Sequence, residues 1–475
     1  MSAEEFRQMV HEVLPDGTVE LDEDILSSLR SRQHAGVTPG AIPHQSHAVL
    51  VDCETAFHEE YVLREDRSIS PKMLVELMGW LAPAEFSTAV GALTQSSGWG
   101  KSRLFAEVGK TYRSFYISMS QSSNTFPRQT GNFTPLQKIL RAHADADVIV
   151  SHIMKCLASY IRSTLDDEHL RSMTPTEWFD YQLMNWHPTY DMADGTTLPP
   201  LALVDATNDL KLQIKRFMQQ FKVPYVLFMC DEAAALLTPS QTDPFCPVFR
   251  LFRRAFAVPG ITACFASTNS RVQNFAPALH DDDSYKRYLS TVRTDSSIPI
   301  APVLSVGVPD CGVQDAPYPV AMHDVLSVEF LSRFGRPLWF AFSRHFDESY
   351  KQQGHKALTA IATSKLIGKS DPDLGVPAAV MVVACVRITP SIQLAEQLVC
   401  SHMATLLHVS KNRELLYVAY GSEPYLAEAA IQHITLNLTA VLHQFLKLVG
   451  SQAIDKGRMG EVIARLCLAL HGYES

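Results

Sequence analysis

A lysine and a serine follow a short glycine-containing stretch, S-G-W-G-K-S, at residues 97–102. An apolar, β-prone run from Phe86 to Leu93 precedes this stretch, and a helical pattern with apolar residues at 104, 105 and 108 follows it. The start of a helix holds phosphate groups well, because its backbone N–H groups and its dipole both favour an anion. The order therefore predicts a strand, a phosphate-binding loop and a helix.

Each residue type in this stretch suits one part of a nucleoside triphosphate, ATP or GTP. Gly98 and Gly100 let the backbone approach the phosphates closely. Lys101 can reach the β- and γ-phosphates, and the Ser102 hydroxyl can bind Mg²⁺. Gln95 stands where the G-x-x-x-x-G-K-[ST] pattern has its first glycine, and a Cβ there can strain the turn, although many backbones tolerate it. The predicted nucleotide contacts are Gln95, Ser96, Ser97, Gly98, Trp99, Gly100, Lys101, Ser102 and Arg103.

Two acidic residues end a second apolar run downstream. Residues 223–230 are mostly apolar and β-prone, and Asp231 and Glu232 follow them. This is the pattern of a buried parallel strand that delivers carboxylates at its carboxyl end. Beside a phosphate loop, we expect Asp231 to bind Mg²⁺ and Glu232 to polarise the attacking water. The alternative is a structural acid, since apolar strands end in acids in many α/β proteins.

A third apolar run, residues 261–265, precedes further polar residues. Ser267, Thr268 or Asn269 could contact the γ-phosphate and hold the attacking water, if this strand neighbours the one that ends in Asp231. Each of them could equally cap a turn.

Arginines are candidates for stabilising charge on the transferred phosphoryl group. They are Arg253 and Arg254 on a predicted helix, Arg271, and Arg336 in the turn F-G-R-P-L-W at residues 334–339. Arg336 is the best placed, because this turn opens a new apolar segment; the alternative for each is a solvated surface arginine. The predicted catalytic residues are Glu232, Lys101, Thr268, Asn269 and Arg336.

Composition limits the class of protein. A chain of 475 residues with 46% hydrophobic content can bury a large core and suggests two to four domains. The formal net charge of −9 argues against a generally basic surface that coats nucleic acid, and leaves local basic patches open.

Cysteine spacing and apolar runs bear on compartment and membrane contact. The nine cysteines form no C-x-x-C pair and no zinc-ligand spacing, so we expect isolated thiols in a reducing compartment. The longest apolar run, residues 376–386, is too short to span a bilayer, and the acidic N-terminus lacks a signal-peptide core. We expect an intracellular protein, cytoplasmic or nuclear, without a membrane segment; the alternative is a protein exported by a route that the sequence does not show.

Helix signals and breaks predict three regions. Residues 1–84 form a helical adaptor, residues 85–340 form an α/β phosphate-loop domain whose mainly parallel sheet is flanked by helices, and residues 341–475 form an all-helical lid or partner surface. This last region is where a partner protein or a second copy would bind. The clearest predicted helices are 71–81, 147–165, 175–186, 210–221, 392–407 and 424–449.

Four strings of the chain resemble the NTPase module of Crinkler-type proteins. They are residues 97–110, the apolar strand that ends in D-E, residues 334–339 and residues 422–430 (S-E-P-Y-L-A-E-A-A), within a similar region of about 85–450. In this fungal and oomycete group, a phosphate-loop ATPase of the AAA+/STAND kind is often followed by a restriction-endonuclease-like domain.

The resemblance implies Mg²⁺-dependent hydrolysis of ATP or GTP, with Lys101, Ser102, Asp231 and Glu232 at the motif positions. It also implies a role in host manipulation or genetic conflict. The sequence departs from the family in two ways. The N-terminus shows no secretion header of the effector forms. No D…E-x-K core follows residue 460, so we predict no nuclease activity.

Three hypotheses follow. The chain is an active NTPase that drives a conformational change in an attached or associated module, a nucleotide-gated interaction module that turns over slowly because Gln95 weakens the loop, or a scaffold without nucleotide. The first two require that Lys101 and Ser102 meet Asp231 and Glu232 around a shared magnesium–triphosphate, and they fail if Lys101 and Asp231 lie on opposite sides of the molecule.

Overall fold

The computed structural model describes residues 69–81, 90–120, 127–188, 190, 198–237, 248–267, 306, 310, 313, 321–344, 351–368, 372–384, 392–410, 415–441, 443 and 465–466. The chain divides into two compact units. Among the described residues, the N-terminal unit comprises residues 69–306 and 409–410, and the C-terminal unit comprises residues 310–408 and those from 415 onward.

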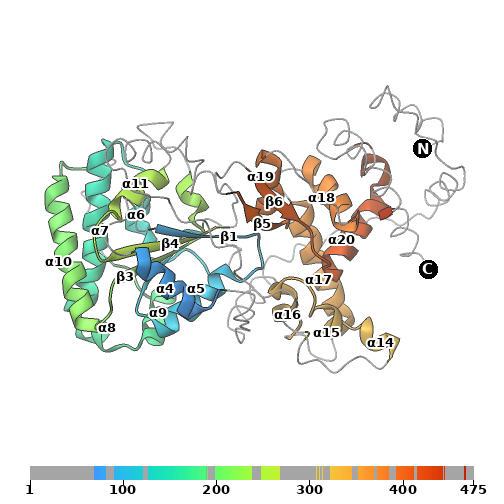
Figure 1. Cartoon of the computed structure of the whole chain (residues 1–475), viewed down its shortest axis with the longest axis horizontal. Helices are drawn as coiled ribbons and strands as arrows, with labels where there is room; N and C mark the ends of the chain where they lie inside the picture. The colour runs from blue at the N-terminus through green and yellow to red at the C-terminus, as the bar shows by residue number, and fades with distance from the viewer. Residues whose placement is uncertain are drawn as a thin grey trace, which may run out of the picture. The chain divides into compact units, whose positions relative to one another are not determined.

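A four-stranded sheet forms the centre of the N-terminal unit (Figure 1). Its order is β1-β4-β3-β2, and each neighbouring pair is parallel. All four strands therefore direct their carboxyl ends to the same edge. The strands are β1 (Val90–Thr94), β2 (Phe115–Ser118), β3 (Val226–Asp231) and β4 (Ile261–Ser267).

Helices cover both faces of this sheet, as Figure 1 shows. Side chains alternate along each strand: Phe228 and Cys230 enter one core, whereas Leu227 and Met229 enter the other. A sheet buried on both faces requires nearly continuous apolar strands, which is the pattern that the sequence shows. The core that contains Phe228 and Cys230 includes side chains of α6 (Phe133–Leu140), α7 (Ala146–Asp166), α8 (Glu168–Ser172), α10 (Leu203–Phe221), η2 (Ala233–Leu237) and α11 (Val248–Ala255). The core that contains Leu227 and Met229 includes side chains of α4 (Pro71–Leu81) and α5 (Lys101–Thr111). Helix α9 (Pro175–Met184) contributes to both cores. The fold class is thus α/β with a parallel sheet flanked by helices, as predicted.

Local signals set several helix starts as expected. Ser70 Oγ accepts a hydrogen bond from the Met73 N–H at 3.1 Å, and Pro71 opens α4. Thr174 and Glu177 form the predicted capping box at α9. α10 begins at Leu203, earlier than the predicted residue 210, because its buried face already includes Ala206.

The C-terminal unit is mainly helical, with α17 and α18 packed against α20. Within the described chain, no helix combines the length and apolar character needed to cross a membrane. The described elements of the C-terminal unit are α14 (Met322–Val325), α15 (Val328–Leu331), α16 (Pro337–Ser343), α17 (Lys351–Ile367), α18 (Pro372–Ala384), α19 (Ile392–Ser401), β5 (Thr405–Val409, of which residue 409 falls in the N-terminal unit), β6 (Leu416–Ala419) and α20 (Pro424–Leu436).

The prediction of an all-helical region after residue 341 is wrong, because β5 and β6 form a two-stranded sheet there. The predicted helix 392–407 ends at Ser401. Met403 has a φ of 63°, a left-handed conformation that cannot continue a right-handed helix. The predicted helix 424–449 also ends early, at Leu436, where the Asn437 N–H donates to the carbonyls of His433 and Ile434.

The domain boundaries differ from the predicted ones as well. The division between the units falls after Val308 instead of residue 340, because the Gly335 turn and α16 belong with α20. Of the predicted adaptor, residues 1–84, the structure describes residues 69–81, and α4 in this range packs against α5 within the N-terminal unit.

A glycine permits the close packing of α5 on α9. A Cβ at Gly109 would lie 2.2 Å from Phe179 Cδ2. We expect Gly109→Ala to lower the free energy of unfolding by about 1–3 kcal/mol, since the overlap outweighs the gain in helix propensity of about 1 kcal/mol. Chemical denaturation of the full chain measures this loss. Gly421→Ala is the control, because apart from its chain neighbours no heavy atom of the described residues lies within 4 Å of its added Cβ. Equal losses in the two variants would contradict the packing argument.

Candidate functional site

Residues 95–100 connect the end of β1 at Thr94 to the start of α5 at Lys101. Gly98 and Gly100 both have a φ of 85°, which residues with a Cβ rarely adopt. The loop therefore requires glycine at these two positions.

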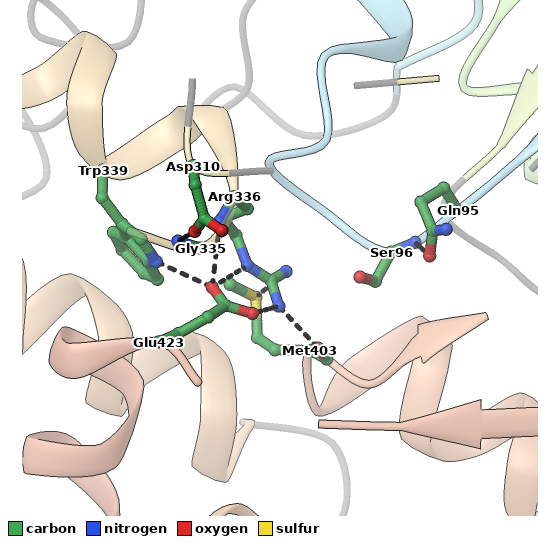
Figure 2. A network of polar contacts seen from close by, with 8 residues as sticks. All are labelled: Gln95, Ser96, Asp310, Gly335, Arg336, Trp339, Met403 and Glu423. Atoms are coloured by element: carbon green, nitrogen blue, oxygen red, sulfur yellow. Dashed lines mark hydrogen bonds and ion pairs between the residues drawn. The ribbon is translucent and has the colours of Figure 1, made fainter. Parts of the chain in front are cut away.

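Gln95 does not need to be glycine in this loop. Its φ is not positive, so its Cβ brings no left-handed strain. The side chain is buried, and its Oε1 accepts a hydrogen bond from the Ser96 N–H at 3.0 Å (Figure 2). The glutamine thus folds onto its own loop and binds one of the loop's backbone donors.

Lys101 lies over the first residues of the loop. The side chain is buried, and its Nζ donates to the carbonyl oxygens of Gln95 at 2.7 Å and Ser96 at 3.0 Å. The first helical hydrogen bond runs from the Leu104 N–H to the Gly100 carbonyl, at 2.8 Å. The N–H groups of residues 101–103 precede this helical ladder, and with Lys101 they give the loop a positive potential.

Asp231 ends β3 as a buried acid, with 1% of its surface exposed. The Tyr116 hydroxyl donates to Oδ2 at 2.9 Å, and the Glu232 N–H donates to Oδ1 at 2.9 Å. In the part of the chain that the structure describes, no lysine or arginine pairs with this carboxylate. Its charge is therefore held by neutral donors.

Burial of Tyr116 raises the pKa of its hydroxyl well above the usual value, and the nearby Asp231 charge raises it further. The hydroxyl stays protonated and acts as a donor. Sequence reasoning missed this residue, since a tyrosine in the apolar run 114–119 looks like an ordinary core residue.

Glu232 adopts a φ of 51°, in the left-handed region, and the 3₁₀ helix η2 follows it. For a residue with a Cβ this conformation costs about 1–2 kcal/mol. Strain of this kind is found more often at functional positions than elsewhere. Glu232 therefore leaves the sheet sharply at the edge where Asp231 lies.

The parallel register brings the loop and the acid to one edge of the sheet. Thr94 of β1 pairs with Ser267 of β4, and Cys230 of β3 pairs with Phe265 of β4. Because only β4 separates β1 from β3, their carboxyl ends lie about 10 Å apart, two strand spacings. Lys101 and Asp231 thus lie at the same edge, where a cationic loop and an acid without a lysine or arginine partner among the described residues can hold an anion and a cation side by side.

The other predicted residues fall into four groups. Ser267 is buried at the end of β4, between the loop and Asp231, whereas Thr268, Asn269 and Arg271 lie outside the described residues. Ser96 and Trp99 are buried within the loop. Salt bridges occupy Arg103, with Glu107 at 3.1 Å, and Arg254, with Asp147 at 2.6 Å.

Arg336 lies in the C-terminal unit, fully buried in a network of polar contacts (Figure 2). Its Nε donates to Glu423 Oε2 at 2.7 Å, and its Nη2 donates to Glu423 Oε1 at 2.8 Å and to the Met403 carbonyl at 2.7 Å. Trp339 Nε1 also donates to Glu423 Oε2, at 2.8 Å. These contacts attach the F-G-R-P turn to the start of α20, and a phosphate contact of Arg336 stays a prediction.

Glu423 contacts several residues of this turn, since it accepts hydrogen bonds from Arg336 and Trp339 and packs against Gly335. Gly335 has a φ of 87°, and a Cβ there would lie 2.4 Å from Glu423 Cγ. Sequence reasoning did not pair Glu423 with Arg336, which lies far away along the chain. The strings at residues 334–339 and 422–430 were the available signal, because both are part of the resemblance noted above.

Loss of the Glu423 charge should destabilise the C-terminal unit. Glu423→Gln leaves the Arg336 guanidinium buried without its anion, a change that typically costs about 3–5 kcal/mol. Urea denaturation followed by circular dichroism measures the loss.

The control is Glu428→Gln within α20, whose partner His355 at 2.8 Å is partly exposed. We expect a loss below about 1 kcal/mol there. If the two variants unfold at the same urea concentration, the Arg336–Glu423 pair does not stabilise this unit.

Two family models match the chain, each described as a domain of unknown function. The first (DUF8735) matches residues 77–292 and includes the loop, Asp231 and Glu232. The second (DUF8736) matches residues 368–474 and includes Glu423. Neither description mentions Crinkler-type proteins, so that resemblance stays a hypothesis.

No curated protein matches the chain. Among solved structures, the chain is similar to the Walker-type ATPase PABY2304 of Pyrococcus abyssi, with 13% sequence identity and a TM-score of 0.40. This likeness covers 79% of this chain and 99% of that chain.

Proposed function

We propose that the N-terminal unit binds a nucleoside triphosphate, ATP or GTP, together with Mg²⁺, and hydrolyses it. The observation that supports this most strongly is the position of Lys101 and Asp231 at the carboxyl ends of two parallel strands separated by one other strand. A magnesium–triphosphate requires a glycine loop at the start of a helix and a buried acid at the end of a nearby strand.

The loop would bind the phosphates. Gly98 and Gly100 lack a Cβ, so they can adopt their positive φ and leave room for the backbone to approach the phosphate chain. N–H groups at the start of α5 would donate to phosphate oxygens, and Lys101 would supply a positive charge beside them. The residues assigned to this contact are Gln95, Ser96, Ser97, Gly98, Trp99, Gly100, Lys101, Ser102 and Arg103.

The residues present suit Mg²⁺. Asp231 and Ser102 supply carboxylate and hydroxyl oxygens, which are ligands that this hard cation prefers. Asp231 is buried and pairs with no lysine or arginine among the described residues, so a bound cation would compensate a charge that is otherwise costly to bury. When bound, Mg²⁺ would neutralise charge on the phosphate oxygens.

Glu232 would orient the attacking water and accept its proton. It follows Asp231 directly, at the edge of the sheet that carries the loop. Ser267, and Thr268 or Asn269 after it, would hold the water or contact the γ-phosphate from β4, between the two motifs. Arg336 binds Glu423 and Met403 and so positions its turn, and its contact with phosphate stays the prediction made from the sequence.

Hydrolysis would drive a conformational change that a partner protein or a second copy senses through the C-terminal unit. A role in a Crinkler-like effector or conflict system is the corresponding biological hypothesis. The second candidate is a nucleotide-gated module that turns over slowly. The Gln95 side chain favours this candidate, because it binds the Ser96 N–H, a donor that the loop would otherwise present to phosphate.

Lys101→Ala should abolish nucleotide binding. A ligand at one hundred times its dissociation constant stabilises the folded state by about 2.7 kcal/mol. We therefore expect Mg-ATP to raise the thermal midpoint of the wild type and to leave that of Lys101→Ala unchanged.

The matched control is Lys110→Ala on the same helix, since Lys110 pairs with Glu107 at 2.8 Å, away from the loop. This variant should keep the full rise in midpoint. A rise of equal size in Lys101→Ala would exclude the loop as the binding site. No rise in the wild type with either ATP or GTP would favour the scaffold without nucleotide.

Glu232→Gln should retain the triphosphate and release phosphate about 10²–10⁴ times more slowly, because the general base is lost. Phosphate release and the nucleotide content of the purified protein measure the two effects. Glu177→Gln is the control, since glutamine also completes a capping box and the wild-type rate should persist.

Phosphate release at the wild-type rate in Glu232→Gln would show that Glu232 is not the base. If the wild type itself retains unhydrolysed nucleotide through purification, the slow nucleotide-gated module is the better description.

A further inference from the structure

Tyr116 lies in β2 beside β3, on the face of the sheet that packs against α5 and α9. Its ring is fully buried and makes edge contacts with Phe105 and Phe179, at centroid distances of 6.4 and 5.2 Å. Ser118 pairs with Asp231 in the parallel register, and residues two apart in a strand share a face. Tyr116 and Asp231 therefore lie on the same face, and the phenol hydroxyl reaches Asp231 Oδ2 at 2.9 Å.

The backbone of Tyr116 is held on both sides. Its N–H donates to Gln182 Oε1 of α9 at 2.8 Å, and its carbonyl accepts from Asn132 Nδ2 at 2.8 Å. Asn132 Oδ1 in turn accepts from Thr130, whose hydroxyl also accepts from the Ser118 N–H at 2.9 Å. In the described sheet β2 is an edge strand, so side chains here satisfy groups that a further strand would otherwise pair. These contacts fix the backbone of Tyr116 independently of the hydrogen bond from its hydroxyl to Asp231.

A neutral donor orients a buried carboxylate without neutralising its charge. A carboxylate accepts at about four positions, and here one donor binds each oxygen, which sets the rotation of the group. A lysine or arginine in place of Tyr116 would orient the carboxylate too, but its positive charge would neutralise the acid and compete with a metal ion. A hydroxyl orients the carboxylate and leaves its charge available.

We propose that Tyr116 is a positioning residue for the cation that Asp231 binds. The inference rests on the proposed function, since it assigns Asp231 to Mg²⁺, and it adds a residue from β2 to a site otherwise made by β1, β3 and β4. Partners that orient metal-binding carboxylates typically change metal affinity by about 10–100-fold when they are removed. Tyr116 acts on Mg²⁺ affinity through Asp231 and makes no contact with phosphate.

The test compares Tyr116→Phe with wild type by the affinity of the full chain for a fluorescent ATP analogue. Affinity is measured over a series of Mg²⁺ concentrations and again in EDTA. We expect Tyr116→Phe to raise the Mg²⁺ concentration that gives half of the tightening by about 10-fold or more. Its affinity in EDTA should stay within about 2-fold of wild type, because phosphate contacts of the loop do not involve this hydroxyl.

Tyr112→Phe is the matched control. The Tyr112 hydroxyl also donates one hydrogen bond, to the Tyr225 carbonyl at 2.7 Å, but Tyr112 and Tyr225 precede β2 and β3 and so lie at the opposite edge from Asp231. This variant loses a comparable hydrogen bond and should keep the wild-type Mg²⁺ dependence.

Three results would overturn the inference. They are an unchanged Mg²⁺ dependence in Tyr116→Phe, an equal loss of affinity with Mg²⁺ and with EDTA, and an equal shift in Tyr112→Phe. Failure of the wild type to bind the analogue at any Mg²⁺ concentration is a separate result, since it would remove the proposed function and this inference together.

Two non-natural amino acids at position 116 provide the same test if the Tyr116→Phe protein does not fold. 4-Fluorophenylalanine at position 116 fills the space of the hydroxyl without a donor, and 4-aminophenylalanine restores an N–H donor. We expect the amino variant to show the wild-type Mg²⁺ dependence and the fluoro variant to show the raised requirement. The same dependence in both would show that the donor has no role.

Discussion

Parallel hydrogen bonding between β1, β4 and β3 is the constraint on which the candidate site depends. Lys101 and Asp231 are far apart along the chain, and neither residue type is unusual. They lie at one edge of the sheet because parallel strands end at the same edge, and the order β1-β4-β3 leaves one strand between them. The apolar content of these strands, buried on both faces, is what stabilises that order.

Neutral groups orient the two charged side chains of the site. Carbonyl oxygens of Gln95 and Ser96 hold the Lys101 ammonium, whereas the Tyr116 hydroxyl and the Glu232 N–H hold the Asp231 carboxylate. Neutral partners fix the geometry of the Asp231 carboxylate without cancelling its charge, so this carboxylate can act on a cation. The C-terminal unit shows the opposite arrangement, since Arg336 and Glu423 neutralise each other in its interior. This pair stabilises structure, whereas the acid at the sheet edge is suited to binding.

Much of the N-terminal unit could be predicted from the sequence, because its signals are local. Continuous apolar runs predicted the strands, and Ser70, Pro71 and the Thr174 capping box predicted helix starts. Features that depend on distant contacts or on one backbone angle could not be predicted. β5 follows a left-handed Met403, a conformation with no reliable sequence signal, and the roles of Tyr116 and Glu423 appear only when their partners are near in space. The missing first glycine proved compatible with the loop, because the backbone at Gln95 does not require a positive φ.

An experimental structure of the full chain with Mg²⁺ and a non-hydrolysable ATP analogue tests the central claim most directly. The account predicts the phosphates against residues 95–102, with Lys101 beside the β- and γ-phosphates. It also predicts the metal ion between Ser102 and Asp231, with Tyr116 still bound to Asp231 Oδ2. Nucleotide bound elsewhere, or a metal ion that does not involve Asp231, would contradict it.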